Sequence, residues 1–233
     1  MLTRMVERLW GRFENLNARR ENAALRRRLA ATAGYDFTVD YISGLLDSWT
    51  RLFAALADRP VRFLEIGSYE GRSTVWFLEN VLRHPESTIT CIDIFSEERW
   101  DLRFVHNIRA SQSAAKVHKL KGRSADRLLE LAGQRFDVIY IDGSHDAADV
   151  LLDATLSWPL LAPGGILLFD DYGWDPEKLA SERPQLAIDL FLEAMQGKFE
   201  VLRKNYQVAV RKLGFNSVDV LSTDVDISSR GTT

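Results

Sequence analysis

Apolar runs and longer amphipathic segments alternate along most of the chain, from residue 61 to residue 212. Short apolar runs predict strands, and segments with apolar residues at helical spacing predict helices. We expect strands at 61–66, 88–94, 117–120, 136–141 and 165–169, a closing antiparallel pair at 199–202 and 207–210, and helices at 73–82, 102–116, 124–131, 147–156 and 184–195. This alternation is typical of an α/β fold with a mostly parallel sheet, here of seven strands, and helices on both faces.

The N-terminal segment, residues 1–33, follows a different pattern. Its first 30 residues hold eight arginines and three glutamates, a local net charge of +5. An amphipathic helix is predicted there because apolar residues recur at helical spacing, at Met5, Leu9, Phe13 and Leu16. We interpret the segment as an arm for packing or homo-oligomerisation; a basic helix lying on an anionic membrane surface is the less favoured alternative.

Two further segments complete the organisation of the chain. A helical pattern with large apolar side chains on one face covers residues 39–57. Residues 216–233 are rich in serine, threonine and aspartate, with little to bury, and predict a flexible tail. We therefore divide the chain into a helical arm (1–33), a main α/β domain (34–215) and this tail.

Composition narrows the class of protein. The chain has 233 residues, 46% of them hydrophobic, and a net charge of −3. These values fit one globular domain with a sizeable core and predict no nucleic-acid partner. Cys91 is the single cysteine, so we expect a buried thiol in a reducing compartment and no internal disulfide. The sequence has no apolar signal region or membrane-length apolar stretch, so we expect a cytoplasmic protein.

A glycine turn follows the first strand, in the sequence FLEIGSYEGRST (residues 63–74). Gly67 and Gly71 permit a tight turn and a close approach of a ligand to the backbone. Their spacing matches neither the phosphate-binding P-loop nor the dinucleotide GxGxxG motif. Glu65 would repel phosphate but could hold an amino group, and Asp93, which ends the second strand, could accept ribose hydroxyls. S-adenosylmethionine is a cationic, ribose-bearing cofactor without phosphate; the alternative is an ordinary strand-to-helix turn.

Carboxylates follow two other predicted strands, in IYIDGSH (139–145) and FDDY (169–172). The carboxyl ends of parallel strands share one edge of the sheet, so Asp142, Asp170 and Asp171 can converge there. Three carboxylates in one crevice need a cation or several hydrogen-bond donors, and hard oxygen ligands favour Mg²⁺. The alternative is that they cap helices or accept backbone N–H groups; Asp142 could serve the turn before the next helix.

Taken together, these motifs give residues 36–212 a resemblance to the class I S-adenosylmethionine-dependent methyltransferases. The glycine turn, Asp93, the DGSH turn (142–145) and the PGG-strand-DD segment (163–171) carry it. The chain most resembles the metal-dependent O-methyltransferases, of the catechol O-methyltransferase-like and macrocin O-methyltransferase-like types. The resemblance implies a Rossmann-like methyltransferase fold for the main domain, transfer of a methyl group to a hydroxyl, and a divalent cation, expected to be Mg²⁺.

The resemblance also implies which residues form the site. The expected cofactor-binding residues are Glu65, Gly67, Tyr69, Gly71, Ser73, Asp93, Ile94, Ser124 and Asp142. Among them, Asp93 would hold the ribose, Ile94 would pack on the adenine and Ser124 would lie at the adenine edge. The implied metal ligands are Asp142, Asp170 and Asp171. His145 and Asp142 are the candidate catalytic residues.

His145 would act as the general base, because an imidazole is largely neutral and able to accept a proton at pH 7. The catechol enzymes have a lysine at the matching position, and the sugar enzymes are more similar here. The alternative for His145 is an exposed histidine in a turn.

The expected methyl acceptor is a small molecule or sugar with vicinal oxygens, which could chelate the metal. Residues 172–183 are long enough to form a lid. Aromatic residues could line the acceptor pocket or equally fill the core, namely Tyr35, Phe37, Trp100, Tyr172 and Trp174. Three alternatives remain open: a metal-independent methyltransferase of the same fold, a non-catalytic binding or assembly protein, and a nicotinamide oxidoreductase, which the glycine turn disfavours.

Overall fold

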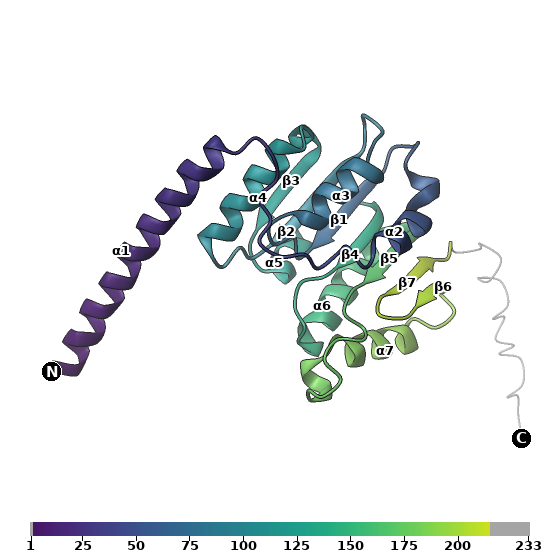
Figure 1. Cartoon of the computed structure of the whole chain (residues 1–233). Coiled ribbons are helices and arrows are strands. Elements are labelled where there is room, and N and C mark those ends of the chain that lie inside the picture. The colour runs from purple at the N-terminus through teal and green to yellow at the C-terminus, as the bar shows by residue number, and fades with distance from the viewer. Residues whose placement is uncertain (1, 215–233) are drawn as a thin grey trace, which may run out of the picture.

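One twisted sheet forms the centre of the molecule in the computed structural model, which describes residues 2–214 and the side chains from residue 17 onward (Figure 1). In this range the sheet has seven strands in the order β3-β2-β1-β4-β5-β7-β6. The strands are β1 (Arg62–Ile66), β2 (Thr88–Asp93), β3 (Val117–Lys121), β4 (Phe136–Ile141), β5 (Leu161–Phe169), β6 (Phe199–Lys204) and β7 (Val208–Lys212). The first five pair in parallel, and β7 pairs antiparallel with β5 and β6. The predicted α/β architecture is confirmed.

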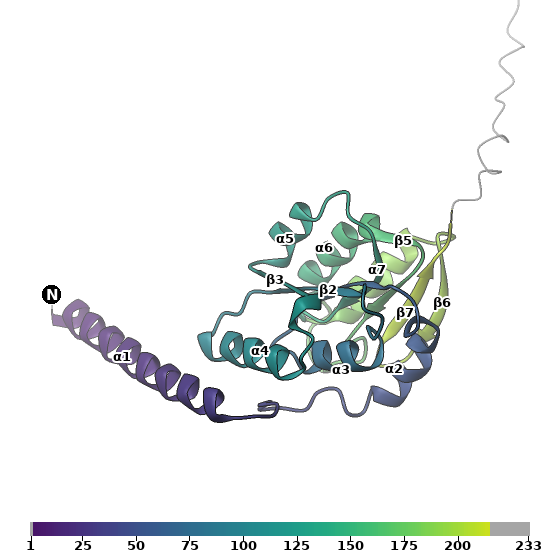
Figure 2. The same ribbon diagram turned by 90° about the horizontal axis from the view of Figure 1, so that it is seen from above.

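Helices cover both faces of the sheet, as Figure 2 shows. The helices are α1 (Leu2–Ala31), α2 (Leu46–Phe53), α3 (Arg72–Asn80), α4 (Glu98–Ala110), α5 (Ser124–Glu130), α6 (Ala147–Ser157) and α7 (Pro184–Ala194). On one face α2, α3 and α4 pack over an aromatic cluster that includes Phe63 and Phe77. On the other, α5, α6 and α7 pack over a cluster that includes Leu64 and Phe191. Phe63 and Leu64 of β1 thus enter opposite cores, which explains why two successive residues of this strand are apolar.

The N-terminal arm forms the predicted helix, α1, and projects from the body of the domain (Figures 1 and 2). Its C-terminal half contacts the domain through exposed polar groups: Asn22 donates to Glu98 over 2.8 Å, and Arg28 pairs with Asp36 at 2.6 Å. The apolar stripe predicted at residues 5–16 lies outside the described side chains, and the tail at 216–233 lies outside the described residues. The oligomerisation role and the domain boundaries therefore stay predictions. Among the described residues, no helix is long and apolar enough to cross a membrane.

The helix predicted over residues 39–57 is wrong in its first half. Helix α2 begins only at Leu46, and a 3₁₀ turn, Ala54–Leu56, ends the segment. The Asp40 side chain accepts hydrogen bonds from the backbone N–H groups of Ile42 and Ser43, at 3.2 and 3.0 Å. Aspartate that bonds to its own downstream backbone competes with helix formation. Residue 41, a tyrosine expected on the buried face, is 75% exposed.

Other elements differ from prediction mainly at their ends. Helix α4 begins at Glu98, before the predicted position 102, and acidic residues in its first turn favour that start. It ends at Ala110, and the predicted remainder contains only a 3₁₀ turn, Ala114–Lys116. Strand β5 begins at Leu161, earlier than the predicted residue 165. Its pairing with β4 has a shift of register between Phe136 and Val138 of β4. Cys91 is a buried free thiol, as predicted.

Candidate active site

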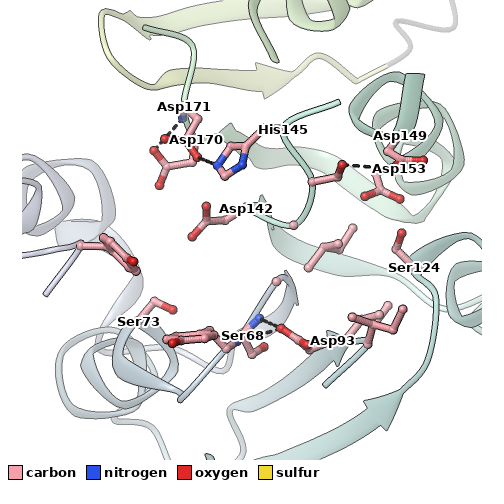
Figure 3. A pocket seen from close by; sticks show the side chains of 18 of the residues that line it. Ser68, Ser73, Asp93, Ser124, Asp142, His145, Asp149, Asp153, Asp170 and Asp171 are labelled. Atoms are coloured by element: carbon pink, nitrogen blue, oxygen red, sulfur yellow. Dashed lines mark hydrogen bonds and ion pairs between the residues drawn. The ribbon is translucent and has the colours of Figure 1, made fainter. Parts of the chain in front are cut away.

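A cavity of about 850 Å³ opens at the carboxyl ends of β1, β2, β4 and β5. Most of the predicted site residues line it, namely Gly67, Tyr69, Ser73, Asp93, Ile94, Ser124, Asp142, His145, Asp170 and Asp171. Figure 3 shows Asp142, His145, Asp170 and Asp171 on one side and Ser68, Ser73 and Asp93 on the other. Open α/β sheets bind ligands at this edge. Glu65 and Gly71 are the two predicted residues that are not among those lining the cavity.

Glu65 lies behind the glycine turn, fully buried. Its carboxylate accepts hydrogen bonds from the hydroxyls of Ser68, at 2.8 Å, Ser73, at 2.6 Å, and Thr74. Burial raises the pKa of Glu65, and these hydroxyls partly offset that increase. Glu65 therefore supports the turn from behind and orients Ser73, which does line the cavity.

The glycine turn brings the ends of β1 and β4 close together. Gly67 has a φ of +89°, and a Cβ built on it would lie 1.9 Å from the carbonyl oxygen of Asp142. Gly71 has a φ of +82° at the start of α3, and its Cβ would approach the Phe104 ring to 3.0 Å. Both positions need the left-handed backbone that glycine adopts readily. Gly67 in particular allows the turn to touch the strand end that carries Asp142.

Asp93 organises the loops around the cavity. Its side chain accepts hydrogen bonds from the backbone N–H groups of Ser68, at 3.0 Å, Tyr69, at 2.8 Å, and Phe95, at 2.6 Å. The next residue, Ile94, is 56% exposed although it is apolar, and it lines the cavity. The carboxylate retains lone pairs for a further donor, and Ile94 offers an apolar surface beside it.

Asp142 and Asp170 share one hydroxyl group. The Tyr140 hydroxyl lies 3.0 Å from Oδ2 of Asp142 and also contacts Oδ2 of Asp170. A phenol carries one proton, so it can donate to only one of the two carboxylates. The Gln207 amide donates to Asp170 over 2.9 Å. Burial raises the pKa of both carboxyl groups, and repulsion by Asp171 raises each of them further.

The alternative role of Asp142 as a helix cap is not realised. Asp146 is the residue that caps α6, because its side chain accepts from the backbone N–H of Ala148 at 2.9 Å. Asp142 therefore does not cap the helix, and its side chain points into the cavity (Figure 3).

His145 is held between a carboxylate and an indole. Its Nε2 lies 2.8 Å from Oδ2 of Asp171, and its ring stacks on Trp174 at a centroid distance of 4.2 Å and an angle of 10°. The other oxygen of Asp171 accepts from the Tyr206 hydroxyl at 2.7 Å. A carboxylate accepts a hydrogen bond, so the proton belongs on Nε2 and the lone pair on Nδ1.

The carboxylates fit a divalent cation by their chemistry. Among residues 17–214, no lysine or arginine forms an ion pair with Asp142, Asp170 or Asp171, and the one Tyr140 proton cannot serve both Asp142 and Asp170. Within that part of the chain, no group of three Asp, Glu, His or Cys side chains has the geometry to hold a metal ion. Each carboxylate oxygen has more than one lone pair, so its present hydrogen bonds leave capacity for a cation.

Sequence reasoning missed four residues of the site. Tyr140 lies in β4 and its hydroxyl faces the carboxylates of Asp142 and Asp170. In the sequence, only its position two residues before Asp142 could have indicated this. Tyr206 and Gln207 come from the hairpin between β6 and β7, and nothing in their local sequence marks them. Asp153 is a buried carboxylate on α6 that lines the cavity. Of the predicted aromatic residues, Phe37, Trp100 and Trp174 line the cavity, whereas Tyr35 and Tyr172 bond to Glu79 and Asp189.

Asp153 is expected to destabilise the folded protein at neutral pH. Burial raises its pKa from the ordinary 3.8 to about 6, although the nearby Ser124 hydroxyl lowers it in part. Below pH 4 the group is protonated in both states and carries no penalty; above pH 6 the folded state holds a buried charge. We expect Asp153→Asn to raise the free energy of unfolding at pH 8 by about 2–3 kcal/mol, and by progressively less toward pH 4.

Urea unfolding of both proteins at several pH values measures this difference. Asp149→Asn is the matched control, since Asp149 lies one turn away on the same helix but is exposed. We expect it to change stability by less than about 1 kcal/mol. An Asp153→Asn effect that is independent of pH would contradict the buried-charge explanation.

Comparison with known proteins agrees with this geometry. Residues 64–172 match the family described as a methyltransferase domain. O-methyltransferase hkm8 of Aspergillus hancockii is 32% identical over 124 residues, which are 53% of this chain and 47% of that protein. The chain thus spans about half the length of this curated relative.

Solved structures share the fold. TomG, an O-methyltransferase of Streptomyces achromogenes involved in tomaymycin synthesis, was solved with S-adenosylmethionine; it is 20% identical, with a TM-score of 0.59 over 77% of this chain and 83% of that one. The methyltransferase MycE of the mycinamycin pathway, solved with Mg, S-adenosylhomocysteine and mycinamycin VI, is 19% identical, with a TM-score of 0.56 over 77% of this chain and 52% of that one.

The sheet order and the site at its carboxyl edge define a Rossmann-like methyltransferase fold. Residues 64–172 are similar to the methyltransferase-domain family, and the predicted resemblance to O-methyltransferases is confirmed by these comparisons.

Proposed function

We propose that the protein is an S-adenosylmethionine-dependent O-methyltransferase that uses a divalent cation to methylate a hydroxyl of a small molecule or sugar. One observation carries this proposal: a single cavity joins the glycine turn and Asp93 to the carboxylate cluster and His145. The two halves match the two needs of the reaction, which are a bound methyl donor and an activated hydroxyl.

The cavity has groups suited to each part of the cofactor, which would supply the methyl group as a sulfonium. The backbone at Gly67 can be approached closely, and Ser73 is oriented by Glu65. Asp93 can accept ribose hydroxyls, and exposed Ile94 can pack against the base. The nearby carboxylates attract a positively charged ligand. S-adenosylmethionine in the TomG structure supports this assignment.

The proposed metal ligands are Asp142, Asp170 and Asp171, and the expected ion is Mg²⁺. A divalent ion there would supply positive charge that favours the deprotonated form of a nearby hydroxyl. Burial and neighbouring carboxylates raise the pKa values of Asp142 and Asp170, so a cation bound there would favour their ionised forms. Mg in the MycE complex supports this choice of ion.

His145 is the proposed general base, acting through Nδ1. Asp171 accepts the Nε2 hydrogen and fixes the tautomer, while Trp174 holds the plane of the ring. The imidazole can then take the proton of an acceptor hydroxyl bound in the cavity. Asp142 contributes by lying beside the reacting groups rather than by accepting the proton.

The acceptor is proposed to be a ring-containing small molecule or sugar. Phe37, Trp100 and Trp174 supply aromatic surface within the cavity, and aromatic side chains stack well on such rings. TomG takes part in tomaymycin synthesis, and the MycE structure from the mycinamycin biosynthetic pathway contains mycinamycin VI.

Calorimetric titration with S-adenosylhomocysteine, with and without Mg²⁺, tests the proposal on the full chain. We expect binding of the nucleoside, tightened by Mg²⁺, and loss of the Mg²⁺ effect in Asp170→Ala. Asp47→Ala, an exposed change on α2, should behave like the wild type. Absence of nucleoside binding would overturn the methyltransferase function, and binding that ignores Mg²⁺ would leave a metal-independent enzyme of the same fold.

A further inference from the structure

The turn between β6 and β7 supplies hydrogen-bond donors to the two carboxylates that follow β5. Strand β7 pairs antiparallel with β5 up to the last residue of β5. Continuing this register by one and two residues brings Gln207 opposite Asp170 and Tyr206 opposite Asp171. The side chains do meet, because the Gln207 amide donates to Asp170 over 2.9 Å and the Tyr206 hydroxyl to Asp171 over 2.7 Å. The hairpin therefore delivers one donor to each carboxylate.

Gln207 is fully buried and is not among the residues that line the cavity. Its amide oxygen accepts a hydrogen bond from the indole N–H of Trp49 at 2.9 Å and another from the guanidinium of Arg203. Indole and guanidinium groups can only donate, so the amide oxygen must face them. The amide nitrogen then has to face Asp170, and the orientation of Gln207 is fixed by its own partners.

The Asp170 carboxylate has a fixed set of donors. Its Oδ2 accepts from Gln207 and contacts the Tyr140 hydroxyl, and its Oδ1 accepts from the backbone N–H of Asp171 at 2.8 Å. Tyr140 also contacts Asp142, so among the described residues Gln207 is the one side-chain donor that Asp170 does not share. A carboxylate has about four lone-pair sites, so the remaining acceptor capacity of Asp170 lies on Oδ1.

The partners of this amide come from segments that flank the conserved-domain match. Trp49 lies on α2, and Arg203 and Gln207 belong to the C-terminal hairpin, all outside residues 64–172. A buried amide is costly unless its polar groups are hydrogen-bonded, and both ends of this one are. The two flanking segments therefore meet at one side chain whose free donor is directed at Asp170.

We propose that Gln207 is a positioning residue for the cation site, because it holds the Asp170 carboxylate so that Oδ1 stays available to a divalent ion. This inference rests on the proposed function, since the ion is the one proposed there. Hydrogen bonds that orient metal ligands are part of the affinity of a site, and their loss typically weakens binding by about 10–100-fold. Segments outside residues 64–172 thus set the affinity of ligands that all lie within that range.

Binding of Mn²⁺ to the full chain, followed by the electron paramagnetic resonance signal of the free ion, tests this role. Mn²⁺ prefers the same oxygen ligands as Mg²⁺. We expect Gln207→Met to weaken Mn²⁺ binding by about ten-fold or more, because methionine retains the length of the side chain but has no N–H donor. Affinity for S-adenosylhomocysteine, measured by calorimetry without metal, should stay within about two-fold of the wild type.

Gln134→Met is the matched control. It makes the same chemical change where the amide oxygen accepts from Arg62 at 2.9 Å, before the start of β4 and away from the cavity. We expect it to bind Mn²⁺ like the wild type. Trp49→Phe retains an aromatic ring but removes one donor to the Gln207 amide oxygen, and we expect Mn²⁺ affinity to fall by about three-fold.

Wild-type Mn²⁺ affinity in Gln207→Met would overturn the inference and leave the cation site in place. Equal losses of Mn²⁺ and nucleoside affinity would also overturn it, because they would indicate a general structural role. If circular dichroism shows that Gln207→Met does not fold, unchanged Mn²⁺ affinity in Trp49→Phe decides against the inference. A wild type that binds no Mn²⁺ removes the cation from the proposed function itself, and this failure is visible without any variant.

Discussion

Gly67→Ala is expected to lower the free energy of unfolding by about 3–5 kcal/mol and to abolish binding of S-adenosylhomocysteine. The added Cβ would lie 1.9 Å from the carbonyl oxygen of Asp142, which is backbone and cannot rotate away. The φ of +89° adds the strain of an L-residue in the left-handed region. Relief would require β1 and β4 to separate at the edge where both halves of the site meet. Urea unfolding measures the loss of stability.

Gly133→Ala is the control that separates the cost of backbone strain from the cost of a steric clash. Gly133 also has a positive φ, +84°, but a Cβ on it would meet no atom within 4 Å. We expect it to cost about 1–2 kcal/mol, the penalty for the left-handed backbone alone. Equal losses for the two variants would show that the contact between Gly67 and Asp142 does not determine the effect.

His145→Ala is expected to slow methyl transfer by about 10²–10⁴-fold while leaving affinity for S-adenosylhomocysteine almost unchanged. The lost imidazole is the group proposed to accept the proton, and it contacts Asp171 and Trp174 rather than the glycine turn. Turnover is measured as formation of S-adenosylhomocysteine with any catechol or vicinal-diol acceptor that the wild type methylates.

His118→Ala provides the control for this prediction. His118 is exposed on β3 and does not line the cavity, so its loss should leave turnover unchanged. Wild-type turnover in His145→Ala would remove the proposed base. A large loss of nucleoside affinity would instead indicate that His145 acts by shaping the cavity.

The strands of the sheet were predictable because their patterns are local and strong. Burial between two helical layers requires apolar side chains on both faces of β1 and β4, which leaves continuous apolar runs in the sequence. The segment 39–57 shows the limit of such patterns. Its apolar spacing favoured one long helix. Backbone N–H groups donate instead to the Asp40 side chain, and the helix begins only at Leu46.

The candidate site was predictable where its residues follow strand ends. Parallel strands place their carboxyl ends on one edge, so Asp93, Asp142, Asp170 and Asp171 had to lie along it. Glu65 shows what position alone could not decide, because a residue near the end of a strand can face either side. Its carboxylate faces the turn, where three hydroxyls satisfy it.

The sequence by itself determined the α/β architecture, the glycine turn and the set of acidic residues at the sheet edge, since each depends on short-range pattern and strand direction. The tertiary structure alone decided which groups share protons and which stay unsatisfied. Tyr140 between two carboxylates, Gln207 from the distant hairpin and buried Asp153 depend on packing between segments far apart in the chain. Burial and proximity set the charge state of such groups, and neither can be read from neighbouring residues.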